Sequence, residues 1–314
     1  MPNQHNKRNF YDRPLKIGTR GSPLALAQAN ETKNRLMDIH SLGEDAFEIC
    51  VISTQGDRVQ NRALSEIGGK GLFTKEIEDN LLSETIDIAV HSMKDMPTEL
   101  PKKLEISVFL EREDPRDSFI SEKYDRIEDL PHGSVVGSSS LRRKAQLLAL
   151  RSDLKVIEFR GNVQTRLKKL KDKVAVATFL ACAGLNRLKM FDLIRPLSIE
   201  KMLPAVAQGV IGIESKTGNR QVFELIKPLN HDLTKIQMLA ERSFLAVLDG
   251  SCRTPIGGHA LVQGNEILFH GEILKPDGSL VHKNIWSGSI SEPEAIGIEA
   301  GNNLKEKGGK NFFG

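Results

Sequence analysis

A turn that joins a predicted strand to a helix carrying two adjacent arginines is the feature that most constrains this sequence. Val135–Val136 ends a predicted buried strand, and the turn Gly137–Ser140 leads into the predicted helix Leu141–Leu150. Arg142 and Arg143 stand in the first turn of that helix, where cations oppose the helix dipole at a cost of about a few tenths of a kcal/mol. An arrangement that accepts this cost indicates an anion at the junction.

The same chemistry recurs at the next junction along the chain. The predicted strand Lys155–Phe159 leads through Arg160 into the helix Val163–Leu170, which carries Arg166. Helix starts offer free backbone N–H groups, and arginines add forked donors that suit carboxylates or phosphates. For a lone Arg-Arg pair a solvated basic face is the alternative, since charge runs usually face water. Two such junctions favour an anion site, because open α/β sheets bind ligands beyond the carboxyl ends of their strands.

A third junction lies near the N-terminus. The predicted strand Leu15–Thr19 ends at Arg20, and Ser22 followed by Pro23 is a good start for a helix that runs to about Met37. Arginine and serine therefore stand at this turn as well.

The composition is that of an ordinary globular protein. The chain has 314 residues, 39% of them hydrophobic and 27% charged, which is enough for two or three domains with their own cores. The net charge of +3 does not argue for nucleic acid, and aromatic residues that could stack on bases are scarce. Met1–Pro14 lacks a secretory core, and no run of eighteen apolar residues occurs. We therefore expect a soluble, cytoplasmic protein with no nucleic-acid or membrane partner, and nothing demands more than a monomer.

The three cysteines fit neither a disulfide framework nor a zinc site, because their number is odd and their spacing wide. No metal site is expected, since the histidines are scattered too. Cys50 and Cys182 are predicted to be small core residues. Cys252 differs, because it lies among Gly, Ser, Thr and Pro with Arg253 adjacent, a setting that favours exposure and thiolate character. A plain loop cysteine is an equally good interpretation of the local sequence.

Polar residues follow the next buried strand. Thr54–Gly71 is Gly-rich and is interpreted as a mobile loop or lid, with a disordered surface loop as the alternative. The strand Ile86–Val90 ends in His91, Lys94 and Asp95. We expect His91 to be a satisfied core histidine. Asp95 is the better catalytic candidate, because a carboxylate among cations stays ionised and can stabilise a developing positive charge.

Two connections indicate how the chain divides. Glu111–Arg116 is a charged crossing into a second α/β unit, and Leu203–Gly209 is a predicted hinge from which Val210–Glu214 could return to the first sheet. Strands between residues 260 and 286 predict a small antiparallel sheet, and Ser291–Glu294 predicts a capping box for the last helix. The predicted domains are 1–110 with 210–228, 116–204, and 232–314.

With these residues assembled, the chain resembles the porphobilinogen deaminase (hydroxymethylbilane synthase) family. The resemblance runs from about Leu15 to the last helix, and its motifs are weak singly but specific in this order. They are Gly18–Ala25, Gly69–Phe73, Ala89–Asp95, Glu111–Asp117, Ser139–Arg143, Arg160–Val163, Leu203–Val206 and the loop around Cys252.

This resemblance implies a fold and an activity. It implies two α/β domains of periplasmic-binding-protein type flanking a cleft, plus a small α+β C-terminal domain with Cys252. That cysteine would hold a dipyrromethane cofactor through a thioether, and four porphobilinogen units would be added to the cofactor with loss of ammonia. Asp95 matches the family's catalytic aspartate. The implied cofactor-binding residues are Cys252, Lys94, Ser92, Ser138, Ser140, Arg142 and Arg143, and the implied substrate-binding residues are Arg20, Ser22, Gln28, Phe73, Arg160, Arg166 and Arg187.

The residues agree with that chemistry, because each pyrrole ring brings an acetate and a propionate that need cationic donors. An intracellular anion-binding protein of periplasmic-binding type is the alternative from another class. The absent signal peptide and the third domain with Cys252 argue against it. Two departures from the family pattern are Glu66, where many relatives have lysine, and Val176, where an acid is common.

Overall fold

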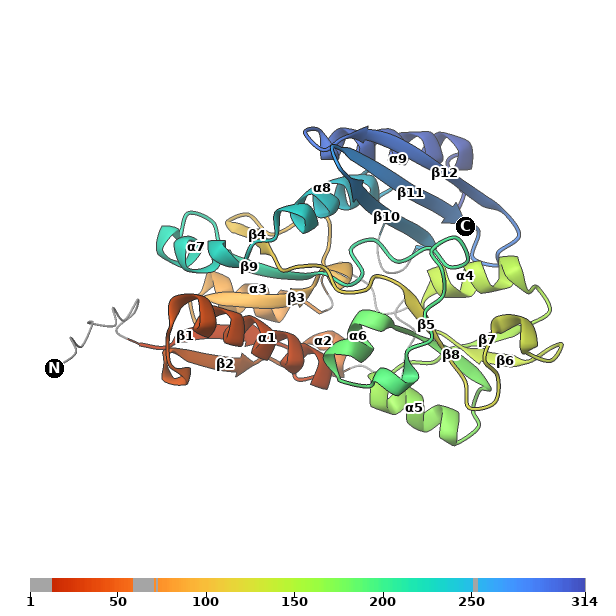
Figure 1. Ribbon diagram of the computed structural model, residues 1–314, viewed down its shortest axis with the longest axis horizontal. Helices are drawn as coiled ribbons and strands as arrows, with labels where there is room; N and C mark the ends of the chain where they lie inside the picture. The colour runs from red at the N-terminus through yellow and green to blue at the C-terminus, as the bar shows by residue number, and fades with distance from the viewer. Residues whose placement is uncertain (1–12, 59–70, 72, 251–253, 314) are drawn as a thin grey trace.

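The computed structural model describes residues 13–58, 71, 73–250 and 254–313, in which three separate sheets form (Figure 1). The first sheet has five strands in the order β2-β1-β3-β9-β4. The strands β1 and β3 run parallel, whereas β9 enters antiparallel between β3 and β4. These strands are β1 (Leu15–Thr19), β2 (Phe47–Val51), β3 (Ile88–Ser92), β4 (Leu104–Phe109) and β9 (Ile211–Lys216). The predicted return of the chain to the first sheet after the hinge is confirmed.

Helix α1 (Pro23–His40) follows β1 as its start signals predict, because the Ser22 side chain accepts a hydrogen bond from the backbone N–H of Ala25. The other helices of this unit are α2 (Gln55–Arg58), α3 (Lys75–Leu82) and α7 (Arg220–Ile226). The prediction of a loop from Thr54 onward was wrong at its start, where α2 forms. Residues 59–70 of that segment, with Glu66, lie outside the described residues.

The second sheet has four strands in the order β5-β8-β6-β7. Strand β6 runs parallel to β7 and β8, so the carboxyl ends of these strands meet at one edge. Helices α4 and α5 begin at that edge, capped by the side chains of Ser140 and Asn162. The elements are β5 (Asp117–Ile120), β6 (Val135–Gly137), β7 (Lys155–Ile157), β8 (Ala177–Ala181), α4 (Leu141–Leu150), α5 (Val163–Lys171) and α6 (Cys182–Arg187). The two predicted arginine junctions therefore lie side by side.

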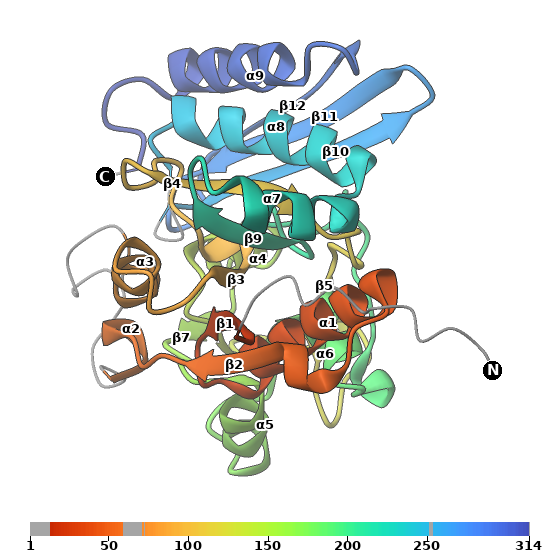
Figure 2. The ribbon, with the colours of Figure 1, turned by 90° about the vertical axis from the view of Figure 1, so that its left-hand side faces the viewer.

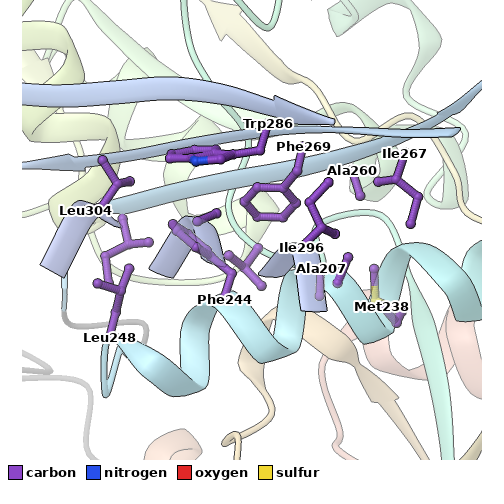
Figure 3. Close-up of a cluster of buried hydrophobic side chains, with 14 of the residues drawn as sticks. Ala207, Met238, Phe244, Leu248, Ala260, Ile267, Phe269, Trp286, Ile296 and Leu304 are labelled. Atoms are coloured by element: carbon purple, nitrogen blue, oxygen red, sulfur yellow. The ribbon is translucent and has the colours of Figure 1, made fainter. Parts of the chain in front are cut away.

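The third sheet is the antiparallel meander β10 (Ile256–Gln263), β11 (Glu266–Leu274) and β12 (Val281–Ser289). Helices α8 (Asp232–Val247) and α9 (Pro293–Gly308) pack together and against it (Figure 2). The core between them is aromatic, with ring centroids of Phe244 and Phe269 4.9 Å apart and Trp286 beside them (Figure 3). The predicted capping box was wrong, because Glu292 occupies the cap position and makes no side-chain cap hydrogen bond. The α/β class with a small α+β unit agrees with the sequence prediction.

Both segments that cross between the first two sheets are anchored to α8 by one buried carboxylate. Glu241 accepts hydrogen bonds from the Arg112 guanidinium on the first crossing and from the Ala207 backbone N–H on the second. It also accepts from the backbone N–H of Ala260 on β10, at 2.9 Å. Burial alone raises the pKa of Glu241, but Arg112 and His259 outweigh burial and hold that pKa at about 2.

Replacing Glu241 with Gln is therefore expected to lower the free energy of unfolding by about 3 kcal/mol at pH 7, because Arg112 is left buried without its counter-ion. A lowered carboxyl pKa contributes stability above its ordinary value of 4.5, and that contribution is lost as the pH falls toward 2. Urea unfolding at several pH values measures the gap in free energy of unfolding between the wild type and Glu241→Gln. Glu299→Gln on the exposed face of α9 is the control. An equal gap at pH 7 and pH 3 would contradict the charge argument.

Candidate active site

The anion predicted at the start of α4 is a carboxylate of the chain itself. Asp117, buried at the start of β5, accepts from Arg142 Nη2 at 2.7 Å and from Arg143 Nη2 at 2.6 Å. Both arginine side chains are buried, so the alternative of a solvated basic face is wrong for this pair. The predicted site omits Asp117, although it closes the charged run that begins at Glu111. The sequence signal for Asp117 was that charged motif, which was interpreted only as a connection between the two α/β units.

One terminal nitrogen of each guanidinium group turns toward a backbone carbonyl. Arg142 Nη1 donates to the Leu203 carbonyl at 2.7 Å, and Arg143 Nη1 donates to that of Phe179 at 2.8 Å. Arg142 Nε is buried and has no hydrogen-bond partner within the described part of the chain. Burial lowers the pKa of Arg142, and Arg143 lowers it further against the opposing effect of Asp117. The pair thus keeps a buried donor for a further acceptor.

Gln208, in the predicted hinge, links this pair to the first sheet. Its Nε2 donates to Asp117 Oδ1 at 2.9 Å, and its Oε1 accepts from Lys94 Nζ at 3.2 Å. Burial lowers the pKa of Lys94 to about 8, and the positive charge of Arg143 contributes to the shift against the opposing charge of Asp95. The charged form of Lys94 is therefore disfavoured mainly by burial, and an added acidic group would favour it.

Asp95 is the exposed carboxylate next to these cations. It ends the short 3-10 turn Met93–Asp95 that follows β3, and its charge acts on Lys94 and on Arg166 of α5. Burial lowers the pKa of Arg166 to about 10, with a further contribution from Arg143. The structure thus brings together predicted site residues from both α/β units.

The predicted residues at the ends of β1 and β3 also lie together in the first sheet. Gln28 Nε2 donates to Ser92 Oγ at 2.8 Å, which ties α1 to the end of β3. The Arg20 guanidinium carbon lies 4.2 Å from the centroid of the Phe73 ring, a cation–π contact. Ser22 caps α1, so its hydroxyl is engaged with backbone.

Several predicted ligands are held by other parts of the protein. Arg187 donates to Glu31 Oε2 at 3.0 Å and to the Gly209 carbonyl at 3.1 Å, which joins α6 to α1 and the hinge. Ser138 Oγ accepts from the backbone N–H of Ser140 at 3.2 Å, which shapes the turn before α4. Arg160 is half-buried at the start of the turn before α5. Their roles toward cofactor or substrate stay predictions.

The structure confirms some of the predictions made for His91 and the cysteines. His91 is buried, and its Nε2 lies 2.9 Å from Glu214 Oε2, which confirms a satisfied core histidine. Cys182 is buried, and burial raises the pKa of its thiol to about 12. Cys50 is half-buried and packs against a core cluster that includes Ile86, so its expected place in the core is confirmed only in part. The side chain of Val176 is exposed, and Cys252 lies outside the described residues.

The balance of charge tests whether the site fits a polyacidic cofactor. Its cations are Lys94, Arg142, Arg143 and Arg166, and its carboxylates include Asp95 and Asp117. Burial is the main cause that lowers the pKa values of Lys94 and Arg166, so the charged forms of both are disfavoured unless acidic groups stand beside them. Acetate and propionate groups would favour those charged forms and could accept from Arg142 Nε. The residues present fit such a group. Within the described chain no group of three or more His, Cys, Asp or Glu could hold a metal ion.

Cations from two α/β units, gathered around a hinge residue with an exposed carboxylate among them, define an enzyme site for an anionic substrate. The family described as "Porphobilinogen deaminase, dipyromethane cofactor binding domain" matches residues 15–224, and "Porphobilinogen deaminase, C-terminal domain" matches residues 235–306. The chain belongs to the porphobilinogen deaminase family, and it is a deaminating transferase of tetrapyrrole biosynthesis with a dipyrromethane cofactor. The alternative of a mere anion-binding protein is not supported.

Two relatives agree with this assignment. The chain is 56% identical over 301 residues to a porphobilinogen deaminase of Paracoccus denitrificans, with 96% of each chain covered. It is 51% identical over 298 residues to one of Nitrobacter hamburgensis, with 95% of this chain and 94% of the relative covered.

A TRAP periplasmic solute binding protein from Desulfovibrio salexigens superposes with a TM-score of 0.41 at 11% identity, covering 72% of this chain and 74% of its own. None of the described helices is long and apolar enough to cross a membrane.

The lowered pKa of Lys94 predicts an alkaline limit to activity. If the site needs this cation, kcat/KM should fall at a pH above 8, because Lys94 loses its proton at about 8 in the cofactor-free protein and at a higher pH once the cofactor's carboxylates are bound. Replacing Lys94 with Arg should move that limit upward by more than a pH unit, because guanidinium groups stay charged. Steady-state rates from pH 7 to 10 measure it, with the exposed Lys102→Arg as the control. The deciding quantity is the pH at which kcat/KM falls, not the maximum value of kcat/KM. If Lys94→Arg leaves that pH unchanged, Lys94 is excluded as its source.

Proposed function

We propose that Asp95 stabilises the positive charge that develops on the aminomethyl carbon of porphobilinogen as ammonia leaves. The enzyme would join four such units head to tail on a dipyrromethane primer and release the linear tetrapyrrole hydroxymethylbilane. The observation that carries this proposal is the placement of Asp95, which is exposed at the end of β3 and coupled by charge to Lys94 and Arg166 from different units.

The chemistry needs a fixed anion at that point. When the carbon–nitrogen bond breaks, the electron pair leaves with the nitrogen, and the carbon keeps a positive charge that the pyrrole ring spreads. A carboxylate held in place stabilises this charge without reorganising, which is the main advantage of a preorganised site. The negative charge of Asp95 in turn raises the pKa values of Lys94 and Arg166, so the carboxylate and the two cations interact as one charged group.

Dipyrromethane, attached through Cys252, would supply the primer to which units are added. Its carboxylates would be held by the donors that surround Asp117 and by the serine turn before α4. The remaining cations would hold the acetate and propionate of the incoming unit. The proposed cofactor ligands are Lys94, Ser92, Ser138, Ser140, Arg142 and Arg143, and the proposed substrate ligands are Arg20, Ser22, Gln28, Phe73, Arg160, Arg166 and Arg187.

Arg187 already donates to Glu31, so it can bind substrate only if that interaction is exchanged. Its guanidinium would have to exchange Glu31 for a substrate carboxylate, so substrate binding would loosen the link between α6 and α1. Cations of one chain make up the proposed site, which supports action as a monomer. The biosynthetic role of the family supports action in the cytoplasm.

Replacing Asp95 with Asn should lower kcat by about 10²- to 10³-fold, because the amide keeps the shape and removes the charge. The cofactor should stay attached, because Asp95 serves the reacting carbon and not the primer. Turnover assays and intact mass spectrometry measure both effects, with Glu99→Gln, an exposed carboxylate four residues further on, as the control. A near-normal rate in Asp95→Asn would remove the residue from its role.

Intact mass spectrometry of the purified protein should find an addition equal to two linked pyrroles. Cys252→Ser should lack that addition, because a hydroxyl does not form the thioether, whereas Cys50→Ser should keep it. Active protein of unmodified mass, or an addition that survives Cys252→Ser, would overturn the assigned attachment.

A further inference from the structure

Glu272 on β11 is a buried carboxylate of the third unit that faces the arginine helix of the second. Its side chain is 7% exposed, and its cross-strand neighbours are Gly257 on β10 and Lys283 on β12. Helix α4, which carries Arg142, contacts β11 (Figure 1). The carboxylate therefore lies where the third sheet meets the predicted cofactor ligands.

The packing around Glu272 brings it to the same point as Arg142. A Cβ atom at Gly257 would come within 2.9 Å of Glu272 Oε1 and 3.1 Å of Leu203 Cδ2, so the carboxylate lies over a bare stretch of backbone beside Leu203. The Leu203 carbonyl accepts from Arg142 Nη1 at 2.7 Å and from Gln146 Nε2 at 2.9 Å. Arg142 and Gln146 are one turn apart on α4, so both face this carbonyl and Glu272.

A hydrogen-bond acceptor and a hydrogen-bond donor lack partners at this point. Glu272 Oε1 and Arg142 Nε are both buried, and neither has a hydrogen-bond partner within the described residues. A buried polar group without a partner costs about 1–3 kcal/mol. The charges of Glu272 and Arg142 nevertheless act on each other, since each favours the ionised form of the other. Glu272 is thus a second counter-ion for an arginine already paired with Asp117.

The surroundings let Glu272 change its charge near neutrality. Burial raises its pKa to about 7, against the opposing effects of Arg142, Lys283 and the Gln146 amide. His270 lies two residues earlier on the same face, but its charge interactions are with His259 and Glu200. The positive charge that Arg142 presents therefore varies with the protonation of Glu272.

We propose that Glu272 is a positioning residue that sets how much of the positive charge of Arg142 is available to the carboxylates of a bound ligand. The proposal rests on the proposed function, in which Arg142 holds carboxylates of the primer, next to which the incoming porphobilinogen binds, so that its available charge also attracts the acetate and propionate of that unit. An ionised Glu272 competes with them for Arg142, and a protonated one does not. Because coupled binding is reciprocal, an anionic ligand that reaches Arg142 also favours the protonated form of Glu272.

The test compares the pH dependence of KM for porphobilinogen in the holoenzyme. From pH 6 to 8.5 the KM of the wild type should rise about fivefold more than that of Glu272→Gln, at the low end of usual coupling. The kcat values of the two should run in parallel. Glu266→Gln, an exposed carboxylate on the same strand, should follow the wild type. KM profiles of wild type and Glu272→Gln that run parallel would overturn the proposal.

Lys283→Gln provides a second measurement that does not disturb a buried position, because Lys283 is exposed. Since Lys283 lowers the pKa of Glu272, its loss should move the inflection of the KM profile to higher pH. An inflection that stays in place would count against Glu272 as its source.

Arg142→Gln separates this proposal from the proposed function. A KM raised at every pH in Arg142→Gln, together with parallel profiles for wild type and Glu272→Gln, would overturn the role of Glu272 alone. An unchanged KM in Arg142→Gln would show that Arg142 does not act on porphobilinogen, which would overturn the role of Glu272; loss of the attached cofactor from Arg142→Gln, measured by intact mass, tests the cofactor role of Arg142 separately.

Discussion

The buried carboxylate of Asp117 is the interaction on which the site depends. It holds Arg142 and Arg143 of α4 against the start of β5, and it accepts from Gln208 of the hinge as well. Burial alone raises its pKa, yet the two arginines outweigh burial and keep that pKa far below its ordinary value. Two guanidinium groups could not stay buried side by side without such a counter-ion, because unpaired buried charge is strongly destabilising.

Asp117 offsets only part of the positive charge around it. Gln208 carries the network on to Lys94 in the first unit, and Glu241 fixes both crossing segments to the third. Any rotation of the units about the crossings would change how these charges face one another. The same contacts that hold the crossings therefore also set the electrostatics of the site, which suits an enzyme whose bound product lengthens.

Local chemistry was enough to predict the junctions, and distant pairing was not. Ser22, Ser140 and Asn162 cap the helices that follow them, because a cap depends on residues three positions apart. Asp117 lies 25 residues from Arg142, and Glu31 lies 156 residues from Arg187, so these pairs depend on strand order and domain contacts. The sequence therefore predicted where cations gather but not which carboxylates of the chain already occupy them. The local sequence around Glu272 did not indicate its proposed role, because that role depends on the packing of α4 on β11.

The most direct test of the account is the pKa of the Lys94 ammonium, measured by NMR titration of the ε-carbon in protein without and with the attached cofactor. We expect a pKa of about 8 in the cofactor-free protein, because burial of the ammonium outweighs its attraction to Asp95. That pKa should rise by about one unit or more once the cofactor's carboxylates are bound, since opposite charges favour the ammonium. An unchanged or lowered pKa would contradict the claim that the cations of this site hold a polyacidic ligand.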